Sequence, residues 1–219
     1  HTAYRRQRQM CIRDSFKKGL SFQSTGKLDM RLGLNQFSCD DVISNISEKN
    51  LNKIFKIFGE EKNSKLIARR IIQNRNKNKL KTEDLVNIVA EIKKYKFSKT
   101  NPSTKIFQAL RIYINKEISE LINGLIYSFK ILPVGGMIVV VTFHSIEDKI
   151  VKFFFKNYSD KKNPSRYAPN VIKNNCLKLK NNKPIVPSND EIMINPASRS
   201  AKLRYAIKTD ENENFNEFH

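Results

Sequence analysis

The chain has 219 residues, 39% of them apolar, which is enough for one or two domains with a packed core. It has no unbroken apolar run of membrane length and no charged segment leading into an apolar one. The composition therefore argues against a membrane protein or a secreted one and predicts a cytoplasmic protein. A net charge of +20 indicates a polyanionic partner such as nucleic acid.

Residues 1–15 are polar and rich in arginine, and they match no expected element. Residues 16–37 are predicted to form a loop that carries Asp29 and Arg31.

Residues 38–100 are predicted to form a compact helical unit. Ser38 with Asp41 is a helix-start signal, and Gly59 stands where a C-capping glycine ends a helix. Two further helices are expected, from about Glu60 to Asn74 and from Thr82. The apolar residues expected to face inward recur at helical spacing: Leu51, Ile54, Phe55, Phe58, Leu66, Ile67, Ile71, Ile72, Leu85, Val86, Val89 and Ile92.

Cations gather on the outer side of this unit, and we interpret them as contacts for RNA. Arg69, Arg70 and Arg75 cluster near one helix end, and lysines between positions 93 and 99 interleave with Tyr95 and Phe97. Exposed rings can stack on unpaired bases, but half-buried connector positions are favoured for these two. Part of the charge has another explanation, because Lys, Asn and Ile are frequent throughout, as in proteins from AT-rich genomes.

From Thr104 the sequence predicts one long helix, with Arg111 off its apolar stripe. The residues of the stripe are Phe107, Leu110, Ile114, Ile118, Leu121 and Leu125. The helix leads through Pro133 to Met137–Val141, a continuous and mostly β-branched apolar run. Such a run predicts a strand buried on both faces of a largely parallel sheet.

The turn after this strand, at His144 and Ser145, is the candidate site, because ligands of open α/β sheets lie beyond the carboxyl ends of the strands. Ser145 with Asp148 is interpreted as the start signal of the next helix, where Glu147 and Asp148 are expected to oppose the helix dipole. A lone histidine in such a place is a structural hydrogen-bonder as often as a ligand contact.

Residues 202–208 alternate in strand fashion, with Leu203, Tyr205 and Ile207 on one face, and are expected to complete an antiparallel hairpin. Residues 209–219 form a polar tail. Four residues at the start of this strand are candidates for phosphate contacts: Arg199, Ser200, Lys202 and Arg204. Arg199 has the alternative of only pinning the loop.

The cysteines and glycines exclude several other kinds of site. Cys11, Cys39 and Cys176 are few and far apart, without C-x-x-C or Cys/His spacing, which favours reduced thiols over a disulfide or zinc framework. No metal site is expected. The seven glycines contain no G-x-G-x-x-G pattern, and the pair Gly135-Gly136 precedes its strand, so no phosphate-cradling loop is seen.

Four segments, in the same order, resemble those of the bacterial RsmH (MraW) family. Phe143–Lys152 is similar to the family's FHSLEDRIVK, and Gly26–Leu32 is similar to GPLDMRM. Asn101–Asn115 resembles HPATRTFQALRI-x-VN, and Asn195–Leu203 resembles NPRARSAKL. The resemblance covers roughly residues 18–208, and four ordered matches are far more specific than one.

This resemblance implies an S-adenosylmethionine-dependent enzyme that methylates N4 of a cytosine in small-subunit ribosomal RNA. The implied fold class is α/β, the C-terminal part of a Rossmann-like class I methyltransferase sheet. Residues 101–208 would supply that part of the sheet, and residues 38–100 would be the family's substrate-recognition insert. The N-terminal strands and the glycine-rich cofactor loop would precede Phe16, and the cofactor-binding residues with them.

The resemblance also implies roles for the candidate residues. His144 and Ser145 would touch the flipped base or the edge of the cofactor, and no catalytic residue is assigned. Asp29 and Arg31 would lie close to the mouth of the active site, and two interpretations of this pair are equally favoured. Arg31 can clamp a phosphate while Asp29 holds the guanidinium, or the two side chains can form an ion pair that only fixes the loop. The target base must leave its stack, at a cost that contacts elsewhere have to meet. Those RNA contacts are expected from Asp29, Arg31, Arg69, Arg70, Arg75, Arg111, Arg199, Ser200 and Lys202.

Two alternatives stay open. The chain can be an RNA-binding module that has no catalytic activity, because it cannot hold the methyl donor. It can also be another Rossmann-like enzyme, although the four ordered segments argue against this. The sequence also leaves open whether the chain forms a homodimer. A strand flank left unpaired by the implied truncation predicts poor solubility of the isolated chain.

Overall fold

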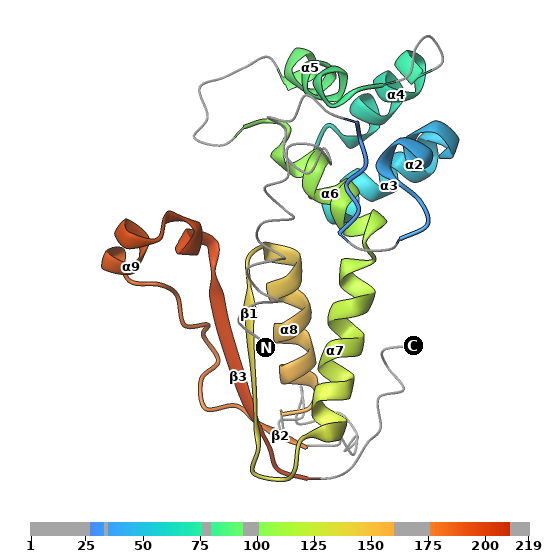
Figure 1. Cartoon of the computed structure of the whole chain (residues 1–219). Helices are drawn as coiled ribbons and strands as arrows, with labels where there is room; N and C mark the ends of the chain where they lie inside the picture. The colour runs from blue at the N-terminus through green and yellow to red at the C-terminus, as the bar shows by residue number, and fades with distance from the viewer. Residues whose placement is uncertain (1–26, 33–34, 76–79, 94–100, 160–175, 211–219) are drawn as a thin grey trace, which may run out of the picture. The chain divides into compact units, whose positions relative to one another are not determined.

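The computed structural model describes residues 27–32, 35–75, 80–93, 101–159 and 176–210 (Figure 1). The chain divides into two compact units, one formed by residues 1–117 and the other by residues 118–219. Each unit has its own hydrophobic core.

The first unit is helical within its described residues. Its helices are α2 (Cys39–Asn45), α3 (Glu48–Phe58), α4 (Ser64–Arg75), α5 (Thr82–Lys93) and α6 (Thr104–Ile114). Helix α3 packs against α4 and α6, α5 packs against α4, and α2 contacts α4 and α6. Large side chains at the centre of the core include Leu51, Phe55, Ile67, Ile71, Leu85 and Leu110.

The local start and stop signals of this unit are confirmed. Ser38 forms a capping box with Asp41, whose carboxylate accepts the Ser38 N–H at 2.8 Å. Gly59 is the C-cap of α3, but its φ of −99° is right-handed. What requires glycine there is space, since a Cβ atom would lie 2.7 Å from the Phe55 oxygen and 2.9 Å from the Lys105 oxygen. Gly59 thus lets α3 approach α6 closely.

Two helix predictions in this unit need correction. Helix α4 begins at Ser64 instead of near Glu60, which has a left-handed φ of 46°. Leu66, expected to face inward, is 51% exposed. The buried stripe of α4 follows i, i+3, i+4, i+7 through Ser64, Ile67, Ala68 and Ile71, and Leu66 lies off it.

The long helix predicted from Thr104 is two helices, α6 and α7 (Glu117–Ile131). The break follows Ile114. Asn115 is the C-cap of α6 and its side-chain amide donates to the Arg111 oxygen at 2.9 Å, while Lys116 takes a left-handed φ of 50°. The apolar stripe continues across the break, and for this reason the pattern alone did not reveal it.

The second unit combines α7 with a small sheet, a helix after its first strand and a short C-terminal helical pair. Its further elements are β1 (Met137–Thr142), α8 (Ser145–Asn157), β2 (Leu177–Lys178), α9 (Asn189–Ile194), the 3-10 helix η2 (Pro196–Ser200) and β3 (Lys202–Lys208). Helix α8 contacts both β1 and β3. Phe129, Ile138, Val151, Phe154 and Ala206 lie in the core of this unit.

The sheet differs from the prediction in strand direction. Its order is β1-β3-β2 and both pairings are antiparallel, with Met137 opposite Ile207 and Thr142 opposite Lys202. A largely parallel sheet is therefore wrong for the described strands, whereas the antiparallel pairing of Lys202–Lys208 is confirmed. The coarse prediction of a mixed α/β fold is confirmed as well.

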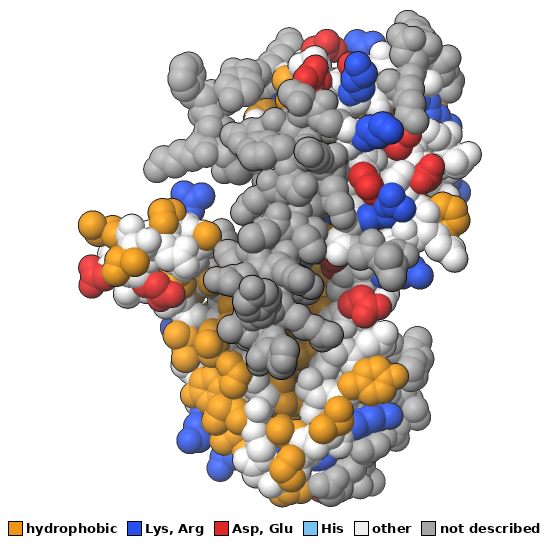
Figure 2. Space-filling view, viewed as in Figure 1, with side chains coloured by type: hydrophobic (Ala, Val, Ile, Leu, Met, Phe, Trp, Pro, Cys, Tyr) orange, Lys and Arg blue, Asp and Glu red, His pale blue; other side chains and the backbone are white. Residues whose placement is uncertain are grey.

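One face of the sheet is uncovered within the described part of the chain, contrary to the prediction that β1 is buried on both faces. Ile138 and Thr142 are buried, but Met137, Val139 and Val141 are 47%, 53% and 49% exposed. In the β1–β3 register these three residues lie opposite Ile207, Tyr205 and Leu203, which are only partly buried. We call these three cross-strand pairs the outer strip: Met137, Val139, Val141, Leu203, Tyr205 and Ile207. Figure 2 shows hydrophobic side chains gathered over this part of the second unit.

The buried face of β3 is formed by Arg204, Ala206 and Lys208. The large apolar residues of this strand, Leu203, Tyr205 and Ile207, thus lie on its more exposed side. No helix within the described ranges is both long and apolar enough to cross a membrane.

Candidate functional site

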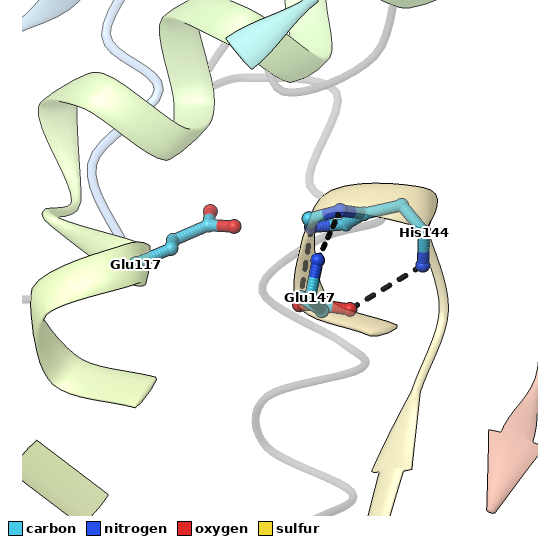
Figure 3. Close-up of side chains that lie close together, drawn as sticks. All are labelled: Glu117, His144 and Glu147. Carbon is cyan, nitrogen blue, oxygen red and sulfur yellow. Dashed lines mark hydrogen bonds and ion pairs between the residues drawn. The ribbon is translucent and has the colours of Figure 1, made fainter. Parts of the chain in front are cut away.

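The turn at the end of β1 is held by a reciprocal cap between His144 and Glu147 (Figure 3). The Glu147 N–H donates to His144 Nδ1 at 3.4 Å, and Glu147 Oε2 accepts the N–H groups of Phe143 at 2.9 Å and His144 at 3.4 Å. The predicted start signal, Ser145 with Asp148, is therefore wrong by one residue. His144 is the N-cap, and Ser145 is the half-buried first residue of α8.

Both ring nitrogens of His144 face Glu147. Nε2 lies 3.1 Å from Glu147 Oε1, and only 11% of the histidine side chain is exposed. Burial raises the pKa of Glu147, but the hydrogen bonds from the His144 ring and the Phe143 amide outweigh it and hold that pKa below its usual range. In this geometry His144 serves the helix start, and contacts of His144 and Ser145 with a base or a cofactor stay predictions.

Asp148 does more than oppose the helix dipole. Its carboxylate accepts hydrogen bonds from Arg204 Nε at 2.7 Å and Nη2 at 3.3 Å, and from Lys202 Nζ at 3.3 Å. Burial raises the pKa of Asp148, and these two cations together lower it further than burial raises it, so the group is a carboxylate at neutral pH. Arg204 is only 9% exposed and also donates to the Asn182 oxygen at 3.2 Å. We therefore interpret Arg204 as a structural partner of Asp148 instead of a phosphate contact.

The Asp29–Arg31 pair predicted from sequence is present in the first unit. Arg31 Nε lies 2.5 Å from Asp29 Oδ1 and Nη2 lies 3.1 Å from Oδ2, while Nη1 donates to the Asn35 oxygen at 3.2 Å. The Arg31 side chain is 37% exposed.

Asn115, which the sequence patterns did not single out, ties this loop to α6. Its side chain bonds Met30, Leu32 and Asn35 in the loop. The one signal for it in the sequence was its place at the end of the segment Asn101–Asn115, which matched the family pattern.

The predicted RNA-binding cations divide into engaged and exposed groups. Arg75 Nη1 donates to the oxygens of Ile43 at 2.5 Å and Ile46 at 2.6 Å, at the end of α2. Arg111 forms a bidentate pair with Glu117, at 2.7 and 3.0 Å, and its side chain is 19% exposed. The exposed candidates are Arg69 and Arg70 on α4 and Arg199 and Ser200 in η2, with the Lys202 side chain 41% exposed.

Some predicted residues lie outside the described residues. These are Cys11, the lysines at 94, 96 and 99, Tyr95 and Phe97. Cys39 and Cys176 are buried free thiols. Burial raises the pKa of each, so neither is a reactive thiolate at neutral pH.

The described residues do not by themselves fit a nucleotide-like methyl donor. A cradle needs glycines between a strand and a helix. Gly59 serves helix packing, Gly124 lies inside α7, and Gly135 and Gly136 precede β1. The carboxylates after β1 already have partners, Glu147 in the helix cap and Asp148 with Arg204.

Comparison with known proteins gives a consistent result. The family model described as "MraW methylase family" matches residues 10–209. "Ribosomal RNA small subunit methyltransferase H" of Afipia carboxidovorans is 41% identical over 198 residues, 90% of this chain and 60% of that protein. A protein of the same name from Brachyspira hyodysenteriae is 40% identical over 88% of this chain and 62% of its own length. One from Rhodopseudomonas palustris is 39% identical over 90% of this chain and 60% of its own length. The chain spans about three fifths of the length of these curated relatives.

Proposed function

Because the chain belongs to the MraW methylase family, we propose that it forms part of an enzyme that methylates small-subunit ribosomal RNA. The acceptor is N4 of a cytosine and the donor is S-adenosylmethionine, as the resembling segments imply. The observation that carries this proposal is 41% identity over 198 residues to a protein named as a ribosomal RNA small subunit methyltransferase.

The positions of the four resembling segments support the proposal. Within the first unit, Asn115 of one segment bonds Met30 and Leu32 of another. Within the second unit, Lys202 of one segment bonds Asp148 of another. Residues that match the family pattern thus hold one another in place across at least 54 positions of sequence. Such paired contacts are expected when the segments build a common framework for a site.

The distribution of charge supports an RNA substrate. Exposed Arg69 and Arg70 on α4 and the half-exposed Lys202 can neutralise phosphates. A cytosine in structured RNA must leave its stack to be methylated, at a cost of about a few kcal/mol that such contacts help to meet. The amine lone pair is delocalised into the pyrimidine, so positioning of that amine supplies much of the rate. We place this activity in the cytoplasm, where ribosomal RNA is assembled into ribosomal subunits.

We propose that the methyl-donor site lies in a part of the protein that this chain does not include. The chain covers 60% of its relatives, and its described residues do not provide a donor cradle. The outer strip, about half exposed at Met137, Val139 and Val141, is where further protein would pack.

Two measurements test the proposal. Calorimetric titration of the 219-residue chain with S-adenosylmethionine should give no saturable binding. The full gene product containing the chain should transfer a labelled methyl group to unmethylated small-subunit ribosomal RNA. A gene product that binds this RNA without transferring the methyl group would favour the second candidate function, an RNA-binding module. That alternative is kept open because the described cations are suited to RNA whether or not a donor binds.

A further inference from the structure

The Asn115 side chain uses its full hydrogen-bonding capacity at the Asp29–Arg31 loop. Oδ1 accepts the Leu32 N–H at 2.8 Å and Asn35 Nδ2 at 2.9 Å. Nδ2 donates to the Met30 oxygen at 2.9 Å and the Arg111 oxygen at 2.9 Å. An amide group has two donors and two acceptor sites, so all four are used. Asn115 therefore holds the residues on both sides of Arg31.

Several features besides Asn115 constrain the conformation of this loop. Met30 has a φ of 57°, a left-handed conformation that is unfavourable for a residue with a Cβ. Its side chain is fully buried, as is that of Leu28. The backbone before it is bonded to the start of α2, since the Asp29 oxygen accepts the Cys39 N–H at 2.8 Å. Such over-determined strain is a feature of functional sites.

These constraints distinguish between the two interpretations of the Asp29–Arg31 pair. The loop is already fixed by Asn115, by buried side chains and by α2, so the ion pair is not needed to hold it. What the pair does fix is the direction of the guanidinium. A guanidinium has five N–H donors, and among the described residues three of them have partners. One donor on each Nη atom remains, on a side chain that is 37% exposed.

We propose that Asn115 is a positioning residue that presents the Arg31 guanidinium to a phosphate group of the RNA. The inference rests on the proposed function for the identity of the ligand. Two N–H groups at one end of a fixed guanidinium match two phosphate oxygens, a pairing that adds geometric specificity to charge. Asp29 holds the Nε–Nη2 edge of the guanidinium, and Asn115 holds the backbone that carries it.

The test measures the affinity of the chain for an unmethylated small-subunit ribosomal RNA transcript over a range of potassium chloride concentrations. A plot of log K against log salt has a negative slope. Arg31→Gln should make this slope less steep by about 0.7 to 0.9, which corresponds to the loss of one phosphate contact. Affinity should fall roughly tenfold at low salt. Asn115→Ala should reproduce both changes. The double variant should be no worse than Arg31→Gln, because Asn115 acts through Arg31.

Asn45→Ala is the matched control, since Asn45 Nδ2 makes one exposed hydrogen bond within α2, to the Asp41 oxygen at 2.9 Å. It should leave the salt slope unchanged. If Asn115→Ala does not fold, Asn115→Asp keeps the size and the acceptor but loses the two donors, and the same slope change is expected. Thermal melting shows which variants are folded under the binding conditions.

Each of four results would overturn the inference. Three concern the variants: an unchanged slope in Arg31→Gln, a lower melting temperature in folded Asn115→Asp with an unchanged slope, and additive losses in the double variant. The fourth is an absence of salt-dependent RNA binding by the wild-type chain. Methyl transfer by the full gene product is measured separately, so the proposed function can stand when this inference fails.

Discussion

Asp148 and Arg204 form a buried bidentate ion pair that joins helix α8 to strand β3, with Oδ1 and Nε 2.7 Å apart. The two residues are 9% exposed or less. A buried carboxylate is tolerated only when its charge is compensated, and Arg204 with Lys202 does this. The pair also fixes the first turn of α8, and with it the His144–Glu147 cap at the end of β1.

Replacing Asp148 with asparagine should destabilise the second unit. Asp148→Asn leaves the Arg204 guanidinium buried without its counter-charge, and removing one partner of a buried pair costs about 3 kcal/mol. Urea unfolding should show this as a lower free energy of unfolding with an unchanged m-value. Asp190→Asn is the control, because Asp190 is exposed on α9 and should change stability by less than about 1 kcal/mol.

The pH dependence of stability follows from the same pair. Burial raises the pKa of Asp148 in the folded chain, but the hydrogen bonds from Arg204 and Lys202 lower it by more, so the pKa lies below its usual value. A carboxylate with a lowered folded pKa contributes stability above its unfolded pKa of about 3.9 and loses it as the pH falls through the folded value. The pKa of Glu147 is lowered too, by His144 and Phe143, against burial.

We therefore expect the free energy of unfolding to fall as the pH drops below about 4. Unfolding curves over acidic pH should show a shallower decline in Asp148→Asn than in the wild type. An equally steep decline in both would show that Asp148 does not carry the effect.

Local signals predicted the helical unit well and the sheet poorly, for physical reasons. A cap such as Ser38 with Asp41 depends on residues three positions apart, so the sequence contains it in full. The face of a strand that is buried depends on what packs on it. Lys208 can be buried, with 1% exposed, because carbonyl oxygens at the end of α7 accept its hydrogen bonds. No pattern within β3 predicts that partner.

The candidate site shows the same division. The Asp29–Arg31 pair could be predicted because its members are two positions apart. Asn115 could not, since its partners Met30 and Leu32 are more than 80 residues away and an asparagine after an apolar stripe is an ordinary helix end. The pairing of Arg204 could not be predicted for a similar reason, because its partner Asp148 is 56 residues away.

Two glycines should respond in opposite directions to alanine. Gly59→Ala places a Cβ within 3 Å of two backbone oxygens, so α3 and α6 must separate, and a loss of about 2 kcal/mol is expected. Gly124 lies on the exposed side of α7 with nothing within 4 Å, so Gly124→Ala should stabilise by about 0.5 to 1 kcal/mol. Thermal melting of both variants checks the pair. A stable Gly59→Ala variant would contradict the close approach of the two helices.

The outer strip should drive self-association of the isolated chain, because exposed apolar strands pair with other molecules. Val139→Thr combined with Val141→Thr should lower the sedimentation-derived oligomer fraction while stability changes little, as both side chains are about half exposed. Ile138→Thr, on the opposite face of the same strand and 6% exposed, is the control. It should destabilise by about 2 kcal/mol without reducing association. A monodisperse wild-type chain would contradict this prediction.

The ammonium group of Lys208 caps the end of helix α7 from inside the core. Nζ donates to the Phe129 oxygen at 3.1 Å and the Leu132 oxygen at 2.8 Å, and it lies 4.5 Å from the centroid of the Phe129 ring. Lys208→Met keeps most of the apolar length but leaves both carbonyls without this donor, so unfolding should become easier by about 2 kcal/mol. Lys178→Met is the matched control, because Lys178 is exposed on β2 and should change little. If both lysine variants melted at the wild-type temperature, the hydrogen bonds of Lys208 would contribute no net stability.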